Sequence, residues 1–291
     1  MRFPFKVALW EKDIRKAVSR ALREDIGEGD ITTVATVGSR AAVDARLILK
    51  QSGIVAGLPI FETVFRVYDP KVKVKIKGKE GRWYDRGKTL AILEGRARSI
   101  LTCERVALNF IQHLSGIATV TRRFVDETKG TRTRIVDTRK TTPGLRLLEK
   151  YAVCVGGGYN HRPTLSDLAL IKDNHIMAAG GVKEAVEKVR AAQPDALVEV
   201  EIGPDTDLGV LKHLDVDIVM LDNWPMARLR KAISTIRRLP SKPLVEVSGC
   251  VRLSSARRIS LCGPDFISVG FITHSSPSLD MSLGLDGGAG A

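Results

Sequence analysis

The sequence predicts an α/β protein whose second half forms a closed or nearly closed barrel of parallel strands. From about residue 132, six short apolar segments alternate with helix-periodic segments through short connections. This alternation is typical of a parallel sheet with right-handed crossovers. Nearly every predicted strand also ends in polar or small residues. An open sheet binds its ligand only near the switch point, so it needs such residues only at the strand ends located there. Polar residues on so many strand ends favour a barrel, where the ends converge on one mouth.

The elements of this second half follow in chain order. The predicted strands are RIVDTRK (134–140), LALIKDN (168–174), LVEVEIG (197–203), DIVMLDN (217–223), LVEVSG (244–249) and FISVG (266–270). The predicted helices lie in GVKEAVEKVRAAQ (181–193), DTDLGVLKHL (205–214), PMARLRKAISTIRRL (225–239) and SSARRISLC (254–262).

The first part of the chain is mixed. Helices are predicted in EKDIRKAVSRALRED (11–25) and GLPIFETVFRVYD (57–69), and strands in DARLILK (44–50) and KVKVKIK (71–77). The lysine face of 71–77 is either a binding patch or a solvated sheet edge, and the edge is favoured. The apolar spacing in residues 99–130 predicts either one helix or two helices that are separated at Gly116. The tail DGGAGA (286–291) is expected to be disordered.

The charge balance predicts an anionic partner. The chain of 291 residues has 46 Lys and Arg against 33 Asp and Glu, a formal charge of +13. Such a balance suits either nucleic acid or an acidic small substrate. Nucleic acid is the weaker interpretation, because there is no basic arm or finger spacing and aromatics are only 5%. Charge alone leaves both classes open.

The location predicted from the sequence is the cytoplasm, with no membrane contact. No apolar run reaches the roughly 18 residues of a membrane helix, and the N-terminus does not resemble a secretory signal. The four cysteines form no CxxC pair and are predicted to be structural thiols. The apolar neighbour Val251 predicts that Cys250 is buried.

The strand ends combine charges of both signs with small residues. Arginine binds carboxylates through its planar fork, lysine suits phosphates as a point charge, and separated carboxylates suit Mg²⁺. The set therefore predicts a substrate that carries both carboxylates and phosphates. Its members are Arg139, Lys140, Lys172, Glu201, Asp222, Ser248, Gly249 and Gly270, with His161 and Arg162 before the second strand and His175 after it.

Alternative site types are not supported by the spacing of the residues. There is no GxxxxGK[ST] phosphate loop and no HExxH or comparable zinc pattern. His113 and His213 lie on helical patterns, which predicts packing or surface roles for both.

Several motifs together resemble the quinolinate phosphoribosyltransferase family. They are REDIGEGDITT, ERVALNFIQHLSGIAT, DTRKTTPGLRLLEKYAV, GGGYNHRPTLSDLALIKDNH, VEVEI, MLDN and VEVSG. They run in order from about residue 23 to residue 283. The TRKTTPG and HRxxLxDxxLIKDNH blocks are specific when they occur together.

The resemblance implies a fold of the type II phosphoribosyltransferase kind. It implies an N-terminal α/β sandwich domain, residues 1–112 joined by 275–291, and an incomplete α/β barrel, residues 113–274. It also implies a homodimer or higher homo-oligomer, in which one subunit closes the barrel mouth of its neighbour. The implied reaction joins quinolinate to phosphoribosyl pyrophosphate with Mg²⁺ and gives nicotinate mononucleotide, CO₂ and pyrophosphate.

The resemblance also implies roles for individual residues. Lys140, Lys172, Glu201 and Asp222 would be catalytic, and Glu201 and Asp222 would hold Mg²⁺ largely through substrate or water. The implied substrate-binding set is Arg105 (from the partner subunit), Thr138, Arg139, Lys140, His161, Arg162, Lys172, Glu201, Asp222, Ser248, Gly249, Cys250, Val269, Gly270 and Phe271.

Two positions depart from the family pattern, and other acceptors stay open. Cys250 stands where small or polar residues are usual, and Phe271 is bulkier than the family's common choice. Nicotinate, or the substrate of the family's molybdenum-linked relative, could replace quinolinate as acceptor. The cluster of Arg139, His161, Arg162 and Lys172 favours a dianionic acceptor over nicotinate.

Overall fold

The structure is a computed structural model that describes residues 3–285 of the chain. It divides into two compact units, which are described separately. The barrel unit comprises residues 3–6, 123–141 and 158–274, and the sheet unit comprises residues 7–122, 142–157 and 275–285. Both contain strands and helices, which confirms the predicted α/β class.

The barrel unit is built on six parallel strands. They are β6 (Arg134–Val136), β7 (Ala169–Ile171), β8 (Val198–Ile202), β9 (Ile218–Asp222), β10 (Leu244–Ser248) and β11 (Phe266–Ser268). Their order is β6-β11-β10-β9-β8-β7. Within the described residues β6 and β7 do not pair with each other, so the barrel is incomplete, as predicted. The register sets Ser248 of β10 opposite Asp222 of β9, which brings the carboxyl ends of these strands level.

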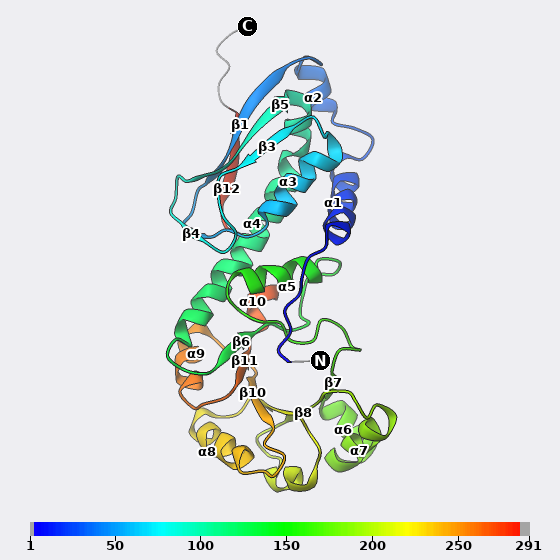
Figure 1. Ribbon diagram of the computed structural model, residues 1–291, viewed down its shortest axis with the longest axis vertical. Coiled ribbons are helices and arrows are strands. Elements are labelled where there is room, and N and C mark those ends of the chain that lie inside the picture. Colours follow the sequence, from blue (N-terminus) through cyan, green and yellow to red (C-terminus); the bar gives the residue numbers. More distant parts are fainter. Residues whose placement is uncertain (1–2, 286–291) are drawn as a thin grey trace. The chain divides into compact units, whose positions relative to one another are not determined.

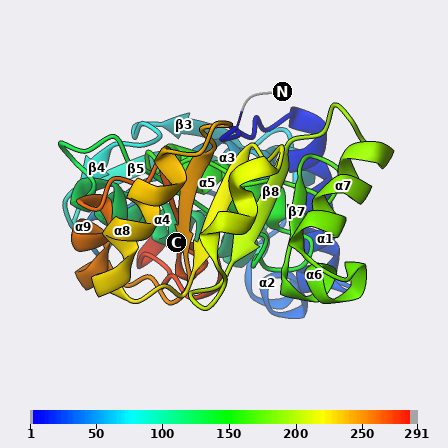
Figure 2. The ribbon, with the colours of Figure 1, turned by 90° about the horizontal axis from the view of Figure 1, so that it is seen from below.

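Helices cover the outside of these strands, as Figures 1 and 2 show. They are α6 (Asp173–Ala179), α7 (Val182–Ala192), α8 (Met226–Arg237) and α9 (Leu253–Ser260), and the short α10 (Phe271–His274) follows β11. Segment 205–214 forms only a 3₁₀ helix, η1 (Leu208–His213), where a regular helix was predicted. The Asp207 side chain accepts from the N–H of Gly209 and closes a tight turn there.

An irregular segment pairs with the edge of β6 that no named strand covers. Tyr159 forms a parallel bridge with Val136 of β6, and Asn160 forms an antiparallel bridge with Phe5. These bridges satisfy backbone groups that an open barrel edge would leave exposed. They also fix the chain just before His161, at the wall of the barrel.

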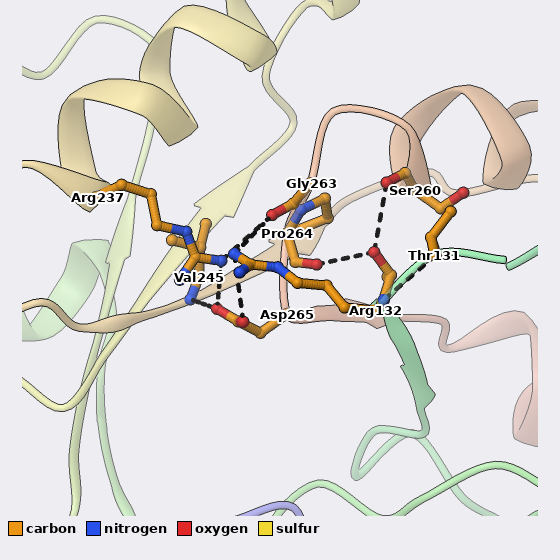
Figure 3. Close-up of polar contacts among 9 residues, drawn as sticks. Thr131, Arg132, Arg237, Val245, Ser260, Gly263, Pro264 and Asp265 are labelled. Carbon is orange, nitrogen blue, oxygen red and sulfur yellow. Dashed lines mark hydrogen bonds and ion pairs between the residues drawn. The ribbon is translucent and has the colours of Figure 1, made fainter.

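A repeated ionic arrangement joins the amino ends of the barrel strands. The carboxylate of Asp265 accepts from the N–H of Val245 (2.8 Å) and from Arg237 (2.7 Å), as Figure 3 shows. Asp217 accepts in the same way from the N–H of Val198 and from Arg190, both at 2.8 Å. In each case an aspartate lies directly before one strand. Its carboxylate connects the start of the strand that comes earlier in the chain to the helix that leads into that earlier strand.

The sheet unit contains an antiparallel sheet and the longest helix. The sheet order is β12 (Met281–Leu285), β1 (Ala42–Leu49), β5 (Thr89–Arg96) and β3 (Lys73–Ile76). As predicted, β3 is an edge strand with exposed lysines. The other elements are β2 (Gly53–Ile54), β4 (Trp83–Tyr84), α1 (Glu11–Ile26), α2 (Ile31–Thr36), α3 (Leu58–Tyr68) and α5 (Arg146–Val155).

The long helix α4 (Ala97–Glu127) is continuous through Gly116, where a break was considered possible. A Cβ atom at this glycine would lie 2.1 Å from the carbonyl oxygen of Pro277. Gly116 therefore permits close packing of the returning chain and does not interrupt the helix. The domain boundary expected at residue 112 falls within this helix, and the compact units part after Arg122. Segment 142–157 belongs to the sheet unit, not to the barrel as expected.

The described cysteines are all free thiols. Among residues 3–285, no helix is long and apolar enough to cross a membrane. The tail predicted to be disordered, 286–291, lies outside the described residues.

Candidate active site

A pocket of about 720 Å³ lies at the carboxyl ends of the barrel strands. All of its lining residues belong to the barrel unit. Because every parallel strand ends at this edge, residues far apart in sequence meet here. The predicted residues that line it are Thr138, Arg139, Lys140, His161, Arg162, Lys172, Glu201, Asp222, Ser248, Gly249, Cys250, Gly270 and Phe271.

Three of the predicted residues do not line this pocket: Arg105, Val269 and His175, whose Nδ1 accepts from the N–H of Lys172. Arg105 is exposed on α4 in the sheet unit, so its proposed contact with a partner's site stays a prediction. Val269 is buried, and its N–H donates to the carbonyl of Val136. That bond ties Val269 to β6, and its side chain belongs to the core.

Other lining residues were missed by sequence reasoning: Leu170, Met220, Asn223, Glu246, Val251, Arg252, Ser268 and His274. Glu246 is the most informative of them, because it is a fully buried acid within an apolar strand. The pattern VEV, in which an acid interrupts a buried strand, was a signal that could have identified it.

The cationic wall consists of Arg139, Arg162 and Lys172. Arg162 is only 6% exposed, and one of its nitrogens donates to the carbonyl of Leu168 at 2.8 Å. Burial and then the adjacent Arg139 lower the pKa of the Arg162 guanidinium. Lys172 forms an ion pair with Glu201 from the neighbouring strand. Two arginines held close together in a partly buried wall are a site for an anion with more than one charge.

Asp137, directly after β6, anchors the chain next to the cationic wall. Its carboxylate is fully buried and accepts from the Asn160 amide (2.7 Å) and from the N–H of His161 (2.8 Å). It therefore anchors the segment that leads into His161 and Arg162.

His161 is held by contacts at both ring nitrogens. The N–H of Arg162 donates to Nδ1 at 2.8 Å. Nε2 lies 2.9 Å from a carboxylate oxygen of Glu199 and 3.6 Å from one of Glu246. The N–H of Arg162 and the two glutamates therefore contact opposite nitrogens of the ring.

Two turns, at the carboxyl ends of β10 and β11, also line the pocket. Gly249 and Cys250 both have positive φ, at 94° and 43°. A Cβ at Gly249 would lie 2.2 Å from Oδ1 of Asn223, so only glycine fits between the ends of β9 and β10. In the second turn, a Cβ at Gly270 would lie 3.1 Å from Cδ of Lys140. Consecutive backbone N–H groups in left-handed turns form concave anion sites.

Cys250 corrects one prediction. It is exposed and lines the pocket, whereas its apolar neighbour predicted burial. The left-handed turn at Gly249 and Cys250 exposes Cys250, and the next residue, Val251, is buried instead.

Glu201 and Asp222 offer a donor set that fits Mg²⁺. They lie at the ends of the paired strands β8 and β9, and both line the pocket. Carboxylate oxygens are the hard ligands that Mg²⁺ prefers, usually one or two together with substrate phosphates. Asp222 accepts from its neighbour Asn223, and Glu201 is shared with Lys172.

The fold and the pocket together define an incomplete α/β barrel with a cluster of cationic side chains at its mouth. Comparison with known proteins narrows this class. The family profile of the quinolinate phosphoribosyl transferase C-terminal domain matches residues 117–284, and that of the N-terminal domain matches residues 30–115. The chain belongs to the quinolinate phosphoribosyltransferase family.

Individual relatives cover nearly the whole chain. The nicotinate-nucleotide pyrophosphorylase [carboxylating] of Mycobacterium leprae is 41% identical, over 93% of this chain and 96% of its own. The probable enzyme of that name from Bacillus subtilis is 41% identical, over 93% and 92%. The crystal structure of nicotinate-nucleotide pyrophosphorylase from Ehrlichia chaffeensis has a TM-score of 0.90 and 39% identity, over 96% and 99%.

Proposed function

We propose that the protein transfers the phosphoribosyl group of phosphoribosyl pyrophosphate to quinolinate and releases pyrophosphate and CO₂. The product is nicotinate mononucleotide, a precursor in NAD biosynthesis. The observation that supports this proposal best is that one pocket is lined both by an arginine-rich wall and by the glycine-containing turns at the ends of β10 and β11. A dicarboxylate and a phosphorylated sugar are the two ligands that such a pocket accommodates.

On the acceptor side, Arg139, Arg162 and Lys172 supply charge to the two quinolinate carboxylates. His161 lines the same wall, and both of its ring nitrogens contact protein groups. Arg105 is proposed to reach this wall from the partner subunit of a homodimer or higher homo-oligomer.

On the donor side, the Ser248–Cys250 turn and the 269–271 turn offer backbone N–H groups to the 5′-phosphate. Lys140 faces the phosphates, and Thr138 precedes it at the same strand end. Glu201 and Asp222 are proposed to contact the ribose hydroxyls and to hold Mg²⁺ together with the pyrophosphate oxygens. When bound, Mg²⁺ would stabilise negative charge on the departing pyrophosphate.

The transfer needs no protein nucleophile. The ring nitrogen of quinolinate attacks the ribosyl carbon as pyrophosphate leaves, and positive charge develops on the sugar. Glu201 and Asp222 lie at the strand ends where they can stabilise that charge, and Lys140 and Lys172 can stabilise the leaving group. Both substrates are polyanions, which accounts for the basic composition without nucleic acid.

The activity is tested by measuring CO₂ release from carboxyl-labelled quinolinate. Release should require both phosphoribosyl pyrophosphate and Mg²⁺, and nicotinate should not replace quinolinate in a parallel assay of pyrophosphate release. Folded protein that releases pyrophosphate with nicotinate alone would establish the alternative acceptor.

Arg162 allows a sharper test of the dicarboxylate wall. Arg162→Ala should raise KM for quinolinate about a hundredfold, since a charge-assisted bidentate contact contributes about 2–3 kcal/mol. KM for phosphoribosyl pyrophosphate should change little. Arg162→Lys is the matched control, because it keeps the charge but loses the planar fork. Its KM for quinolinate should lie between those of the native protein and of Arg162→Ala. A normal quinolinate KM in Arg162→Ala would contradict this assignment.

The shared site is a separate proposal with its own test. Arg105→Ala and Arg162→Ala subunits should each be nearly inactive as pure homo-oligomers. If Arg105 acts across the interface, reassembled mixtures should recover activity in about a quarter of the sites. No recovery in verified mixed oligomers would place Arg105 in its own subunit's site. Cytoplasmic location, proposed from the sequence, is checked by cell fractionation.

A further inference from the structure

A buried acidic cluster that includes the ring of His161 lies at the pocket. It consists of Glu199 of β8, Glu246 of β10 and the His161 ring, whose ligand-type atoms all lie within 4.8 Å of one another. Both glutamates are 0% exposed. Their four carboxylate oxygens accept no well-aligned hydrogen bond from any residue that the structure describes. Two ionised carboxylates buried in this way would be very unfavourable.

The imidazole cannot neutralise this pair. Even a charged ring carries only one positive charge, against two carboxylates. Two cations interact with the pair, Lys172 with Glu246 and Arg162 with Glu199, but Lys172 is paired with Glu201 and Arg162 donates to the carbonyl of Leu168. The geometry therefore requires an additional proton on the carboxylate pair, since like charges this close cannot both be ionised in a dry site.

That proton belongs on Glu246. Burial, and then the charge of Glu199, raise the pKa of Glu246 well above its usual range, and His161, Ser268 and Lys172 oppose this only in part. The two glutamates also differ in position, because Glu246 lines the pocket and Glu199 does not. A carboxylic acid thus lies at the pocket floor next to the wall expected to hold quinolinate.

We propose that Glu246 is the general acid that protonates the quinolinate ring carbon from which CO₂ departs. The inference rests on the proposed function and adds to it the source of the final proton. Once the ring nitrogen is ribosylated, the bond between the ring carbon and its carboxylate breaks. The electron pair stays on the ring carbon next to the positive nitrogen, and CO₂ leaves as a neutral molecule.

The proton of Glu246 then forms the new C–H bond and leaves a carboxylate behind. Solvent restores this proton after the product leaves, so each turnover consumes one proton and needs no other reactant. An un-ionised Glu246 also avoids placing a second buried negative charge against a dianionic substrate. The other groups nearby are less suited: Nε2 of His161 lies 2.9 Å from a carboxylate oxygen of Glu199, and Lys172 is bound to Glu201.

The test separates transfer from decarboxylation in a single turnover. Glu246→Gln keeps the shape of the side chain but has no acidic proton. It should release pyrophosphate within about threefold of the native rate, whereas formation of nicotinate mononucleotide should slow about a hundredfold or more. The carboxylated mononucleotide should accumulate and be visible by mass spectrometry. Pyrophosphate and CO₂ released in step by Glu246→Gln would overturn the proposal.

Two further variants control for damage to the cluster. Glu199→Gln alters the buried contact with His161 but not the pocket lining, because Glu199 does not line the pocket. This variant should not accumulate the carboxylated intermediate, even if its overall rate is lower. Glu246→Asp keeps an acid and should accumulate less intermediate than Glu246→Gln. Equal accumulation in Glu199→Gln and Glu246→Gln would mean that the cluster only positions His161, which contradicts direct proton donation.

A measurement on the native protein avoids any folding problem of the variants. Infrared spectra at neutral pH should contain the C=O band of a protonated carboxyl group, which shifts in D₂O and is perturbed by quinolinate. No such band, or a stoichiometric transition metal bound by the cluster, would overturn the proposal. If the native protein releases neither pyrophosphate nor CO₂, the proposed function itself fails, a result distinct from these outcomes.

Discussion

At the residue scale, Gly249 connects backbone conformation to substrate binding. Its φ is 94°, and a Cβ at this position would lie 2.6 Å from the Asn223 backbone nitrogen, so there is no room for a side chain. Gly249→Ala should cost about 1–3 kcal/mol or force the turn to move. Because the turn is proposed to bind the 5′-phosphate, KM for phosphoribosyl pyrophosphate should rise at least tenfold while KM for quinolinate stays near native. Steady-state kinetics and thermal unfolding measure both effects.

Gly203 provides the matched control for this substitution. It follows β8 as Gly249 follows β10, but a Cβ there meets nothing within 4 Å. Gly203→Ala should therefore leave both KM values and the melting temperature close to native. Similar kinetic losses in the two variants would mean that strand-end glycines have a general structural role, unrelated to phosphate.

Single residues also show what the sequence could and could not predict about the site. Arg139, Lys172, Glu201 and Asp222 could be grouped because the carboxyl ends of parallel strands must meet. Glu246 could not be grouped with them, since it lies inside its strand and reaches the pocket only through the barrel interior.

At the element scale, the paired aspartates stabilise the amino ends of the barrel strands. Asp265→Ala should remove the acceptor of the buried Val245 N–H and the partner of Arg237, at a cost of about 2–3 kcal/mol. Asp217→Ala should cost less, because the Asp217 side chain is 37% exposed against 16% for Asp265. Water can replace the lost bonds more readily at Asp217. Urea unfolding of each variant measures the difference.

Asp215 is the control for this pair, since it also contacts Arg190 but is 81% exposed. Asp215→Ala should change stability by less than about 0.5 kcal/mol. Because these carboxylates lie at the strand starts and the pocket lies at the strand ends, kcat/KM of all three variants should stay near native where the proteins are folded. Equal destabilisation by Asp215→Ala and Asp265→Ala would contradict the role of the backbone bonds.

Elements differed in how well periodicity predicted them. The six barrel strands were predictable because buried parallel strands are short, continuous apolar runs. The 3₁₀ helix at 208–213 could not be predicted in this way. Its apolar residues have the spacing of a regular helix, but Gly209 and the turn formed by Asp207 prevent one. Strands β5 and β12 were missed, since pairing with β1, which is distant in sequence, determines their conformation.

At the scale of the whole molecule, the formal charge of +13 is expected to act through the field of the pocket. Salt screens attraction between a basic cleft and an anionic substrate, with a screening length of about 10 Å at 0.1 M. With Mg²⁺ held constant, kcat/KM for phosphoribosyl pyrophosphate should fall about tenfold between about 0.02 and about 0.3 M ionic strength. Saturating kcat should not change, because it reports steps after binding.

Two variants distinguish the local field from the net charge. Arg252→Gln removes one charge from a residue that lines the pocket, so it should lower kcat/KM at low salt and flatten its salt dependence. Lys73→Gln combined with Lys75→Gln removes two charges from the exposed β3 edge, which lies in the other unit. That double variant should keep the native salt dependence. If it flattens the dependence more than Arg252→Gln, steering follows the total charge and not the pocket.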